Sequence, residues 1–106
     1  MDALTVPGTL DSLAAIRTFV NEMGEKAGLD RKALYRLKLA VDEIATNIVT
    51  YGYENAGLRG DIVISAHLQP SVLFILVARR IGFRIRSVLA IHACPSWQAS
   101  ESVCMT

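Results

Sequence analysis

Residues 34–53 place the strongest constraint on how this chain can fold. Apolar side chains recur there at spacings of three and four, which predicts one long helix whose apolar stripe packs on a core. The members of that stripe are Leu34, Leu37, Val41, Ile44 and Ile48. Glu43 and Asn47 are four residues apart, so the helix stacks them, and Thr50 continues their row. At roughly 100° per residue, we expect this row about a third of a turn from the centre of the stripe.

This polar row of a carboxylate, an amide and a hydroxyl has two interpretations. Glutamate and asparagine are common on exposed helix faces, and a pair four residues apart is usually a solvated pair. In the other interpretation the row is a rigid platform for chemistry, because the other side of the helix is anchored in a core.

The residues before this helix predict a strand and a first helix. Residues 3–6 end at Pro7, which suits an edge strand because proline cannot donate to a central ladder. Thr9 is expected to cap the first helix and Gly28 to end it. Its apolar side chains recur at helical spacing and predict a second packed stripe: Leu13, Ile16, Val20, Met23 and Ala27.

The residues after the first helix complete a recognisable order of elements. Asp30 is expected to cap the long helix and Gly52 to end it. Residues 61–68 alternate between two faces and residues 72–77 are uniformly apolar, which predicts two strands joined by a turn at 69–71. The order of strand, two helices and hairpin predicts an α/β two-layer sandwich, with the helices on one face of a mainly antiparallel sheet.

Composition limits the class of protein. A chain of 106 residues is long enough for one domain with one core. No apolar run approaches the length of about 20 residues that spans a membrane, and the start lacks the features of a signal peptide, so we expect a cytoplasmic protein. Cys94 and Cys104 lack metal-ligand spacing and are expected to be reduced thiols. The net charge of +1 gives no argument for a nucleic-acid partner.

The string that runs from Glu43 through Asn47 to Gly52 and Tyr53 resembles the asparagine box of the GHKL ATPases. This superfamily contains the ATP-binding domains of gyrase, heat-shock chaperones and histidine kinases. Within it, the string is particularly similar to the bacterial anti-sigma serine kinases, whose box has a histidine where this chain has Tyr51. The resemblance covers about residues 1–78.

The resemblance implies a histidine-kinase-like ATPase fold, with ATP and Mg²⁺ as cofactors and serine/threonine protein kinase activity. It makes Asn47 the magnesium ligand and Glu43 the base in phosphoryl transfer, with Thr50 beside them at the nucleotide. The implied partners are a sigma factor and an antagonist protein that is phosphorylated on a serine. The chemistry is consistent with these roles, because magnesium takes few protein ligands and an amide oxygen is one that suits it. A carboxylate one turn away can accept a proton from an attacking hydroxyl.

The chain departs from the family pattern after about residue 78. The family has an Asp-x-Gly box there, whose aspartate accepts a hydrogen bond from the adenine amino group, followed by a glycine-rich lid over the phosphates. This chain has Arg79 and Arg80 at that point, no aspartate after Asp61 and no glycine after Gly82. We therefore expect nucleotide binding and kinase activity to be impaired, and the chain to stop short of a full family domain.

Residues 79–106 differ from the rest in charge. They carry four Arg against one Glu, a net charge of +3, whereas residues 1–78 carry seven Lys and Arg against nine Asp and Glu, a net charge of −2. Codons for residues 78–84, read one base along, can encode Arg-Asp-Glu-Ser-Ala-Phe followed by Asp or Glu, which resembles the missing box. One hypothesis is therefore a frame change in the gene or its reading, which sequencing of the coding DNA tests.

The rival hypothesis treats this tail as native. Ile81, Phe83 and Ile85 alternate with polar or small residues, which favours an extra strand with a basic face, and residues 88–93 continue as an apolar segment. The tail's four arginines would then bind an acidic partner or phosphates, or form a solvated basic edge that discourages strand pairing: Arg79, Arg80, Arg84 and Arg86. The alternative function class is a non-catalytic module that forms a homodimer or heterodimer through its helices and exposed sheet.

Overall fold

The computed structural model describes residues 2–68, 72–82, 84–93 and 101–105 of the chain. The elements follow one another as β1 (Asp2–Pro7), a short 3₁₀ turn η1 (Leu10–Ser12), α1 (Leu13–Lys26), α2 (Arg31–Asn47), η2 (Ile48–Glu54), β2 (Asp61–Leu68), β3 (Leu73–Ile81), β4 (Arg84–Ala93) and β5 (Glu101–Met105). This order contains the predicted strand, two helices and hairpin.

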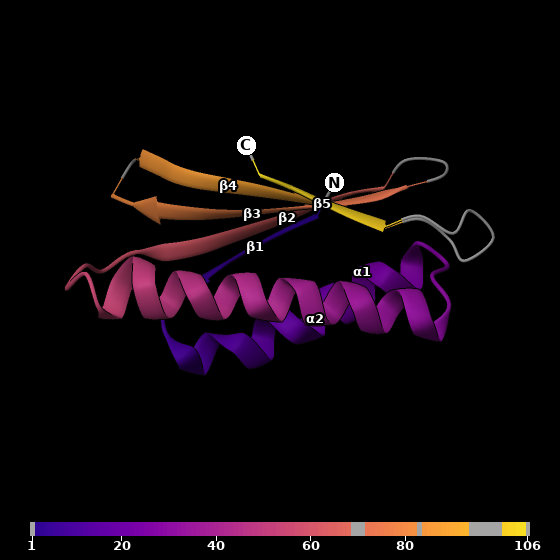
Figure 1. Cartoon of the computed structure of the whole chain (residues 1–106), viewed down its shortest axis with the longest axis horizontal. Helices are drawn as coiled ribbons and strands as arrows, with labels where there is room; N and C mark the ends of the chain where they lie inside the picture. Colours follow the sequence, from indigo (N-terminus) through magenta and orange to yellow (C-terminus); the bar gives the residue numbers. More distant parts are fainter. Residues whose placement is uncertain (1, 69–71, 83, 94–100, 106) are drawn as a thin grey trace.

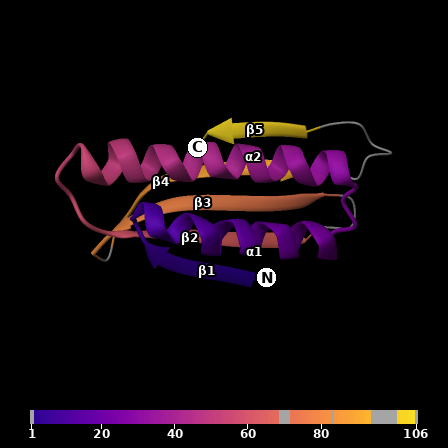
Figure 2. The same ribbon diagram turned by 90° about the horizontal axis from the view of Figure 1, so that it is seen from below.

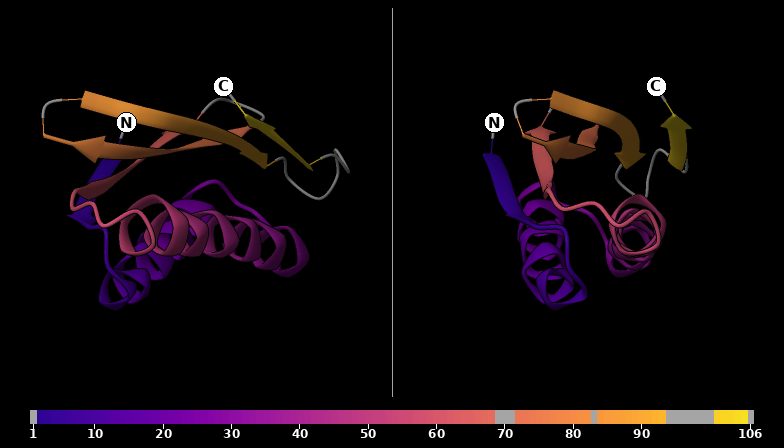
Figure 3. Two further views of the ribbon diagram at one scale, coloured as in Figure 1. Left: turned by 60° about the vertical axis from the view of Figure 1, so that its left-hand side comes forward. Right: turned by 90° about the vertical axis from the view of Figure 1, so that its left-hand side faces the viewer.

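All five described strands form one antiparallel sheet in the order β1-β2-β3-β4-β5. Both helices lie on the same face of that sheet, as Figures 1 and 3 show. Figure 2 shows α1 beneath the β1 side of the sheet and α2 beneath β4. The predicted fold class, a two-layer α/β sandwich with helices on one face, is therefore confirmed.

The core lies between the helices and the sheet. Its sheet side is formed by Ile62 and Ile64 of β2 and Ile75 and Val77 of β3, all of them fully buried. The helical side includes most of the stripe predicted for α1, with Ile16 and Val20 fully buried, while Ala27 is only half-buried. Burying an aliphatic side chain of this size contributes about 1.5–3 kcal/mol, so these contacts are the main force that holds the two layers together.

The turn between the two helices forms as predicted. The glycine that follows α1, Gly28, has a φ of 74°, a left-handed conformation that glycine adopts without strain. The carboxylate of Asp30 accepts a hydrogen bond of 2.8 Å from the backbone N–H of Ala33, which confirms Asp30 as the N-cap of α2. Thr9 behaves differently, because its hydroxyl lies 3.4 Å from that of Ser12 and caps no backbone group.

The helical stretch predicted from residue 34 to 53 is not one regular helix. After Asn47 it continues as the π-helical segment η2, in which the N–H of Asn55 donates to the carbonyl of Thr50 over 2.8 Å. Gly52 lies buried inside η2, so the prediction that it ends the helix was wrong. Beyond η2, Gly57 adopts the left-handed conformation with a φ of 67°.

The tail adds two strands to the sheet. β3 continues past residue 78 to Ile81, with a register shift between Arg79 and Arg80, and the chain then reverses at Gly82, where φ is 62°. Residues 81–86 therefore do not form the single strand of the rival hypothesis, because Ile81 and Arg84 face each other across a hairpin. The predicted turn at 69–71, Phe83 and Cys94 lie outside the described residues. Within the described residues, no helix has the length and apolar character needed to cross a membrane.

Candidate functional site

The polar row lies at the C-terminal end of α2 and in η2. The side chains of Glu43 and Asn47 are exposed, and Thr50 is half-buried. In the part of the chain that the structure describes, none of the three makes a side-chain hydrogen bond or ion pair. The carboxylate and the amide are therefore free to bind a ligand, and their Cβ atoms are separated by one helical turn, about 5–6 Å.

The row points farther from the core than the sequence predicts. Up to Val49, the buried residues of α2 and the start of η2 are Ala33, Leu37, Val41, Ala45 and Val49, whereas Leu34, Ile44 and Ile48 are only half-buried. The packed stripe is thus rotated from its predicted centre. Glu43 follows Val41 by two residues, so its side chain points nearly half a turn away from the core instead of a third. This rotation explains why Glu43 and Asn47 are both exposed.

The helix α2, which carries most of this exposed row, is held against α1. The helix packs against α1 through an ion pair in which Nε of Arg17 lies 2.7 Å from a carboxylate oxygen of Asp42. The hydrogen bond and the charge of Asp42 raise the pKa of Arg17, so this guanidinium stays charged. Asp42 marks the flank of α2 that faces α1. Asn47 is five residues further on, so on an α-helix it lies on the other flank of α2.

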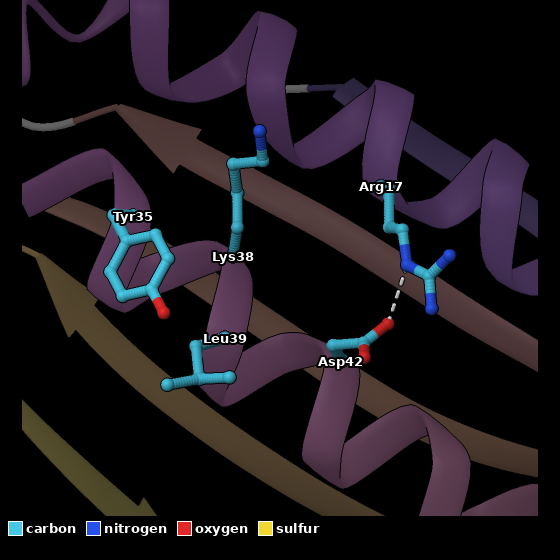
Figure 4. Close-up of a pocket in the computed structure, with 5 residues that line it drawn as sticks. All are labelled: Arg17, Tyr35, Lys38, Leu39 and Asp42. Atoms are coloured by element: carbon cyan, nitrogen blue, oxygen red, sulfur yellow. Dashed lines mark hydrogen bonds and ion pairs between the residues drawn. The ribbon is translucent and has the colours of Figure 1, made fainter. Parts of the chain in front are cut away.

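A hollow of about 240 Å³ lies on the outer side of the helical layer. Figure 4 shows that it is bounded by Arg17 of α1 and, on α2, by Tyr35, Lys38, Leu39 and Asp42. None of the polar row lines this hollow, which belongs to the groove between the two helices. The hollow is therefore a different surface feature from the candidate site.

The environment of Asn47 is compatible with its predicted role as a magnesium ligand. The amide of Asn47 is exposed and unpaired, and magnesium commonly takes one or two protein ligands together with phosphate oxygens and water. Among the described residues there is no group of three or more His, Cys, Asp or Glu side chains that could hold a metal ion alone. A cation at Asn47 would therefore need phosphate oxygens to complete its coordination.

A contact on the sheet side of η2 has no signal in the sequence. Nη1 of Arg79 donates to the main-chain carbonyl of Gly52 over 3.2 Å, and a Cβ atom on Gly52 would lie 2.9 Å from the same nitrogen. Gly52 thus lies where a side chain from β3 approaches the helical stretch, and it does not end a helix. The other arginine of the pair, Arg80, is placed differently, because its Nη2 lies 2.9 Å from a carboxylate oxygen of Asp61.

The fold and the sequence together define the class of this protein. The chain belongs to the histidine kinase-like ATPase domain family, whose sequence model matches residues 6–80. This confirms the family resemblance found around Glu43 and Asn47.

Two known proteins are similar in sequence to part of this chain. The chain is similar to the anti-sigma-F factor RsbW of two strains of Mycobacterium tuberculosis, CDC 1551 / Oshkosh and ATCC 25618 / H37Rv. Each is 39% identical over 56 residues, which cover 53% of this chain and 33% of the relative. The chain therefore spans about one third of the length of the curated relatives it matches.

Proposed function

We propose that this chain is a cytoplasmic regulator of transcription of the anti-sigma type, which binds a sigma factor and an antagonist protein and interacts weakly with a magnesium–nucleotide complex. The family assignment and the similarity to RsbW support the anti-sigma role. The observation that carries the nucleotide role is the pair Glu43 and Asn47, held one turn apart, exposed and unpaired on a helix with a buried opposite side.

The two side chains would have separate roles. The amide oxygen of Asn47 would bind Mg²⁺, which offsets charge on the phosphates when it is bound. The carboxylate of Glu43 would accept a proton from the serine hydroxyl of an antagonist, or orient that hydroxyl. The hydroxyl of Thr50, half-buried in η2, would lie near the nucleotide. We expect phosphoryl transfer to be impaired, because the chain lacks the aspartate and the glycine-rich lid of the family pattern.

A titration with a fluorescent ATP analogue, with and without Mg²⁺, tests the nucleotide role. We expect weak, magnesium-dependent binding that Asn47→Ala abolishes. Asn55→Ala is the matched control, because Asn55 is an exposed asparagine just outside η2 and outside the polar row. Binding that is unaffected by Mg²⁺ and by Asn47→Ala would exclude Asn47 as the metal ligand.

A second candidate function, a non-catalytic interaction module, is favoured by the neighbours of the polar row. Every fourth residue from Tyr35 to Tyr51 is exposed and forms what we call the outer ridge: Tyr35, Leu39, Glu43, Asn47 and Tyr51. Three of these are large apolar or aromatic side chains, with exposures of 66% for Tyr35, 46% for Leu39 and 68% for Tyr51. Exposed tyrosines and leucines in one line are typical of a surface that contacts another protein.

The same titration separates the two functions. No binding at millimolar nucleotide, together with a homodimer or a heterodimer that Tyr51→Ser disrupts, would support the interaction module. Sedimentation velocity over a range of protein concentrations measures the homodimer directly. Magnesium-dependent nucleotide binding that requires Asn47 would instead support the first function.

A further inference from the structure

The groove between α1 and α2 contains two neighbouring hollows. The first is the hollow of about 240 Å³ in Figure 4, with the exposed side chains of Tyr35 and Leu39 on its α2 side. The second, of about 370 Å³, shares Arg17 and Lys38 with the first and continues along α1. The first hollow is smaller than the roughly 300–1,000 Å³ of small-molecule sites, so it suits one side chain of a protein partner.

The half of α2 that borders this groove is strongly basic. Residues 31–41 contain no Asp or Glu and four basic residues: Arg31, Lys32, Arg36 and Lys38. In the part of the chain that the structure describes, none of the four forms an ion pair. Lys38 donates to the neutral amide oxygen of Asn21 over 3.3 Å. Arg17 differs, because Asp42 lies 2.7 Å from its Nε and balances its charge. The four charges on α2 are therefore available to an anionic partner.

These charges act against the stability of the helix. The N-terminal end of a helix favours acidic residues, but after the N-cap Asp30 the first turn of α2 contains none. Lys32 and Arg36 are four residues apart, so their like charges repel each other across one helical turn. A segment that breaks local rules, without a compensating contact among the described residues, indicates a surface kept for function.

The basic side chains lie next to the apolar ones. Lys32 precedes Tyr35 by three residues, and Arg36 precedes Leu39 by three. On a helix this spacing places the Cβ atoms of each pair about 5–6 Å apart. Lys38 lines the first hollow itself. The groove thus presents an apolar anchor site with a basic rim.

We propose that this groove binds an acidic amphipathic helix of a protein partner. One apolar side chain of that helix fills the hollow beside Tyr35 and Leu39, and its carboxylates pair with the basic residues of α2. The inference rests on the protein-binding role in the proposed function and gives its partner a chemical character. A nucleic acid would match the charges, but its phosphates would leave Leu39 and the hollow without an apolar partner.

The test is fluorescence anisotropy with a labelled peptide of about 20 residues, long enough to form a helix. The peptide carries leucines on one helical face and glutamates on both sides of it. One comparison peptide has glutamine in place of every glutamate, and another has serine in place of every leucine. We expect the parent peptide to bind at least about tenfold more tightly than either comparison peptide.

Four variants locate the binding surface. Leu39→Ser and Arg36→Glu should each weaken binding of the parent peptide about tenfold. Leu58→Ser and Arg59→Glu are the matched controls and should bind as wild type. Leu58 is 45% exposed against 46% for Leu39, and Arg59 is exposed like Arg36. Circular dichroism checks the fold of each variant. Equal losses in the test and control variants, or no binding at millimolar protein, would overturn the proposal.

Two further measurements examine other occupants of the groove. Binding of a duplex DNA oligonucleotide that Arg36→Glu weakens and Leu39→Ser leaves unchanged would assign the basic rim to phosphates. A dimer in sedimentation velocity without peptide, disrupted by Leu39→Ser, would assign the groove to a second copy of the chain. Either result would overturn the acidic helix as the occupant.

Titration of the same proteins with the fluorescent ATP analogue separates this inference from the nucleotide role. That role depends on Asn47, whereas peptide binding depends on Arg36 and Leu39. Peptide binding that persists in Asn47→Ala supports the groove, even if no nucleotide binds and the nucleotide role fails. Magnesium-dependent nucleotide binding without peptide binding would refute the groove and leave the nucleotide role intact.

Discussion

The hydroxyl of Tyr53 donates to the main-chain carbonyl of Asp61 over 2.6 Å, and the carbonyl of Arg80 lies 3.1 Å from the same oxygen. Asp61 begins β2 and Arg80 lies near the end of β3, and the two residues pair across the sheet. Tyr53 itself is buried in η2. One side chain thus ties the end of the helical stretch that carries Asn47 to the start of β2 and the end of β3, next to Arg79.

Replacing Tyr53 with phenylalanine should destabilise the fold. The substitution keeps the ring but removes the donor shared by the two main-chain carbonyls in part-buried contacts. We expect a loss of about 0.5–1.5 kcal/mol in the free energy of unfolding, the typical net contribution of a hydrogen bond. Urea denaturation followed by circular dichroism measures it. Tyr51→Phe is the control, because Tyr51 is exposed, and its effect should be within about 0.5 kcal/mol.

The advantage of Tyr53 over phenylalanine should disappear at alkaline pH. Burial raises the pKa of Tyr53 above its ordinary value near 10, although the charge of Arg79 opposes the shift. The folded state therefore holds this proton more tightly than the unfolded state, so the stabilisation is complete below about pH 10 and is lost as the pH rises through the folded pKa. The difference in urea midpoint between wild type and Tyr53→Phe should narrow from pH 9 to pH 11. A constant difference would contradict the shift.

Gly60 should tolerate alanine poorly, because the space around it is filled. A Cβ atom there would collide with the carbonyl oxygen of Arg80 and lie 2.9 Å from the ring and the hydroxyl of Tyr53. We expect Gly60→Ala to cost more than Gly28→Ala, because Gly28 has open space around it and costs only the strain of its positive φ, about 1 kcal/mol. Urea denaturation of the two variants, measured in parallel, shows which substitution lowers the free energy of unfolding more. Equal losses would show that β3 and Tyr53 can move aside.

The architecture of this chain follows from its sequence because its periodicities are simple. The alternation in residues 61–68 predicts β2, and Ile62, Ile64 and Ala66 are indeed buried on one face. Leu68, at the end of the same strand, belongs to the same alternating set but is 58% exposed. Local pattern therefore identifies the face of a strand but not how far the opposing layer covers it.

The predictions from the sequence are wrong at residues whose positions depend on tertiary contacts and not on the local spacing of apolar residues. Gly52 is a typical helix-ending residue, but here it admits Arg79 from a strand 27 residues away. The buried stripe on α2 and η2 includes Ala45 and Val49, whereas the predicted members Ile44 and Ile48 are only half-buried. Neither the Arg79–Gly52 contact nor the position of the buried stripe can be derived from the spacing of apolar residues. The polar row was found from the sequence, but its exposure could not be derived before the packed face of α2 was known.

Asp30 and Thr9 should differ as capping residues. Only Asp30 accepts a hydrogen bond from the backbone of its helix, at the N–H of Ala33. We expect Asp30→Ala to cost about 1 kcal/mol and Asp30→Asn to retain most of the stability, because asparagine caps nearly as well. Thr9→Ala should cost clearly less than Asp30→Ala. Thermal unfolding of the three variants measures the effect, and a larger loss for Thr9→Ala would mean that its hydroxyl caps η1 in solution.

Substitutions in the polar row should affect binding without affecting the fold. Glu43 and Asn47 are exposed and make no side-chain hydrogen bond in the described part of the chain, so Glu43→Gln and Asn47→Ala should change the free energy of unfolding by less than about 0.5 kcal/mol. Val41→Ala, on the buried side of the same helix, should cost about 1–3 kcal/mol by opening a cavity. If magnesium-dependent nucleotide binding is lost in Asn47→Ala while its urea midpoint is unchanged, the loss comes from the ligand itself. A midpoint that falls as far as that of Val41→Ala would show instead that Asn47 supports the helix.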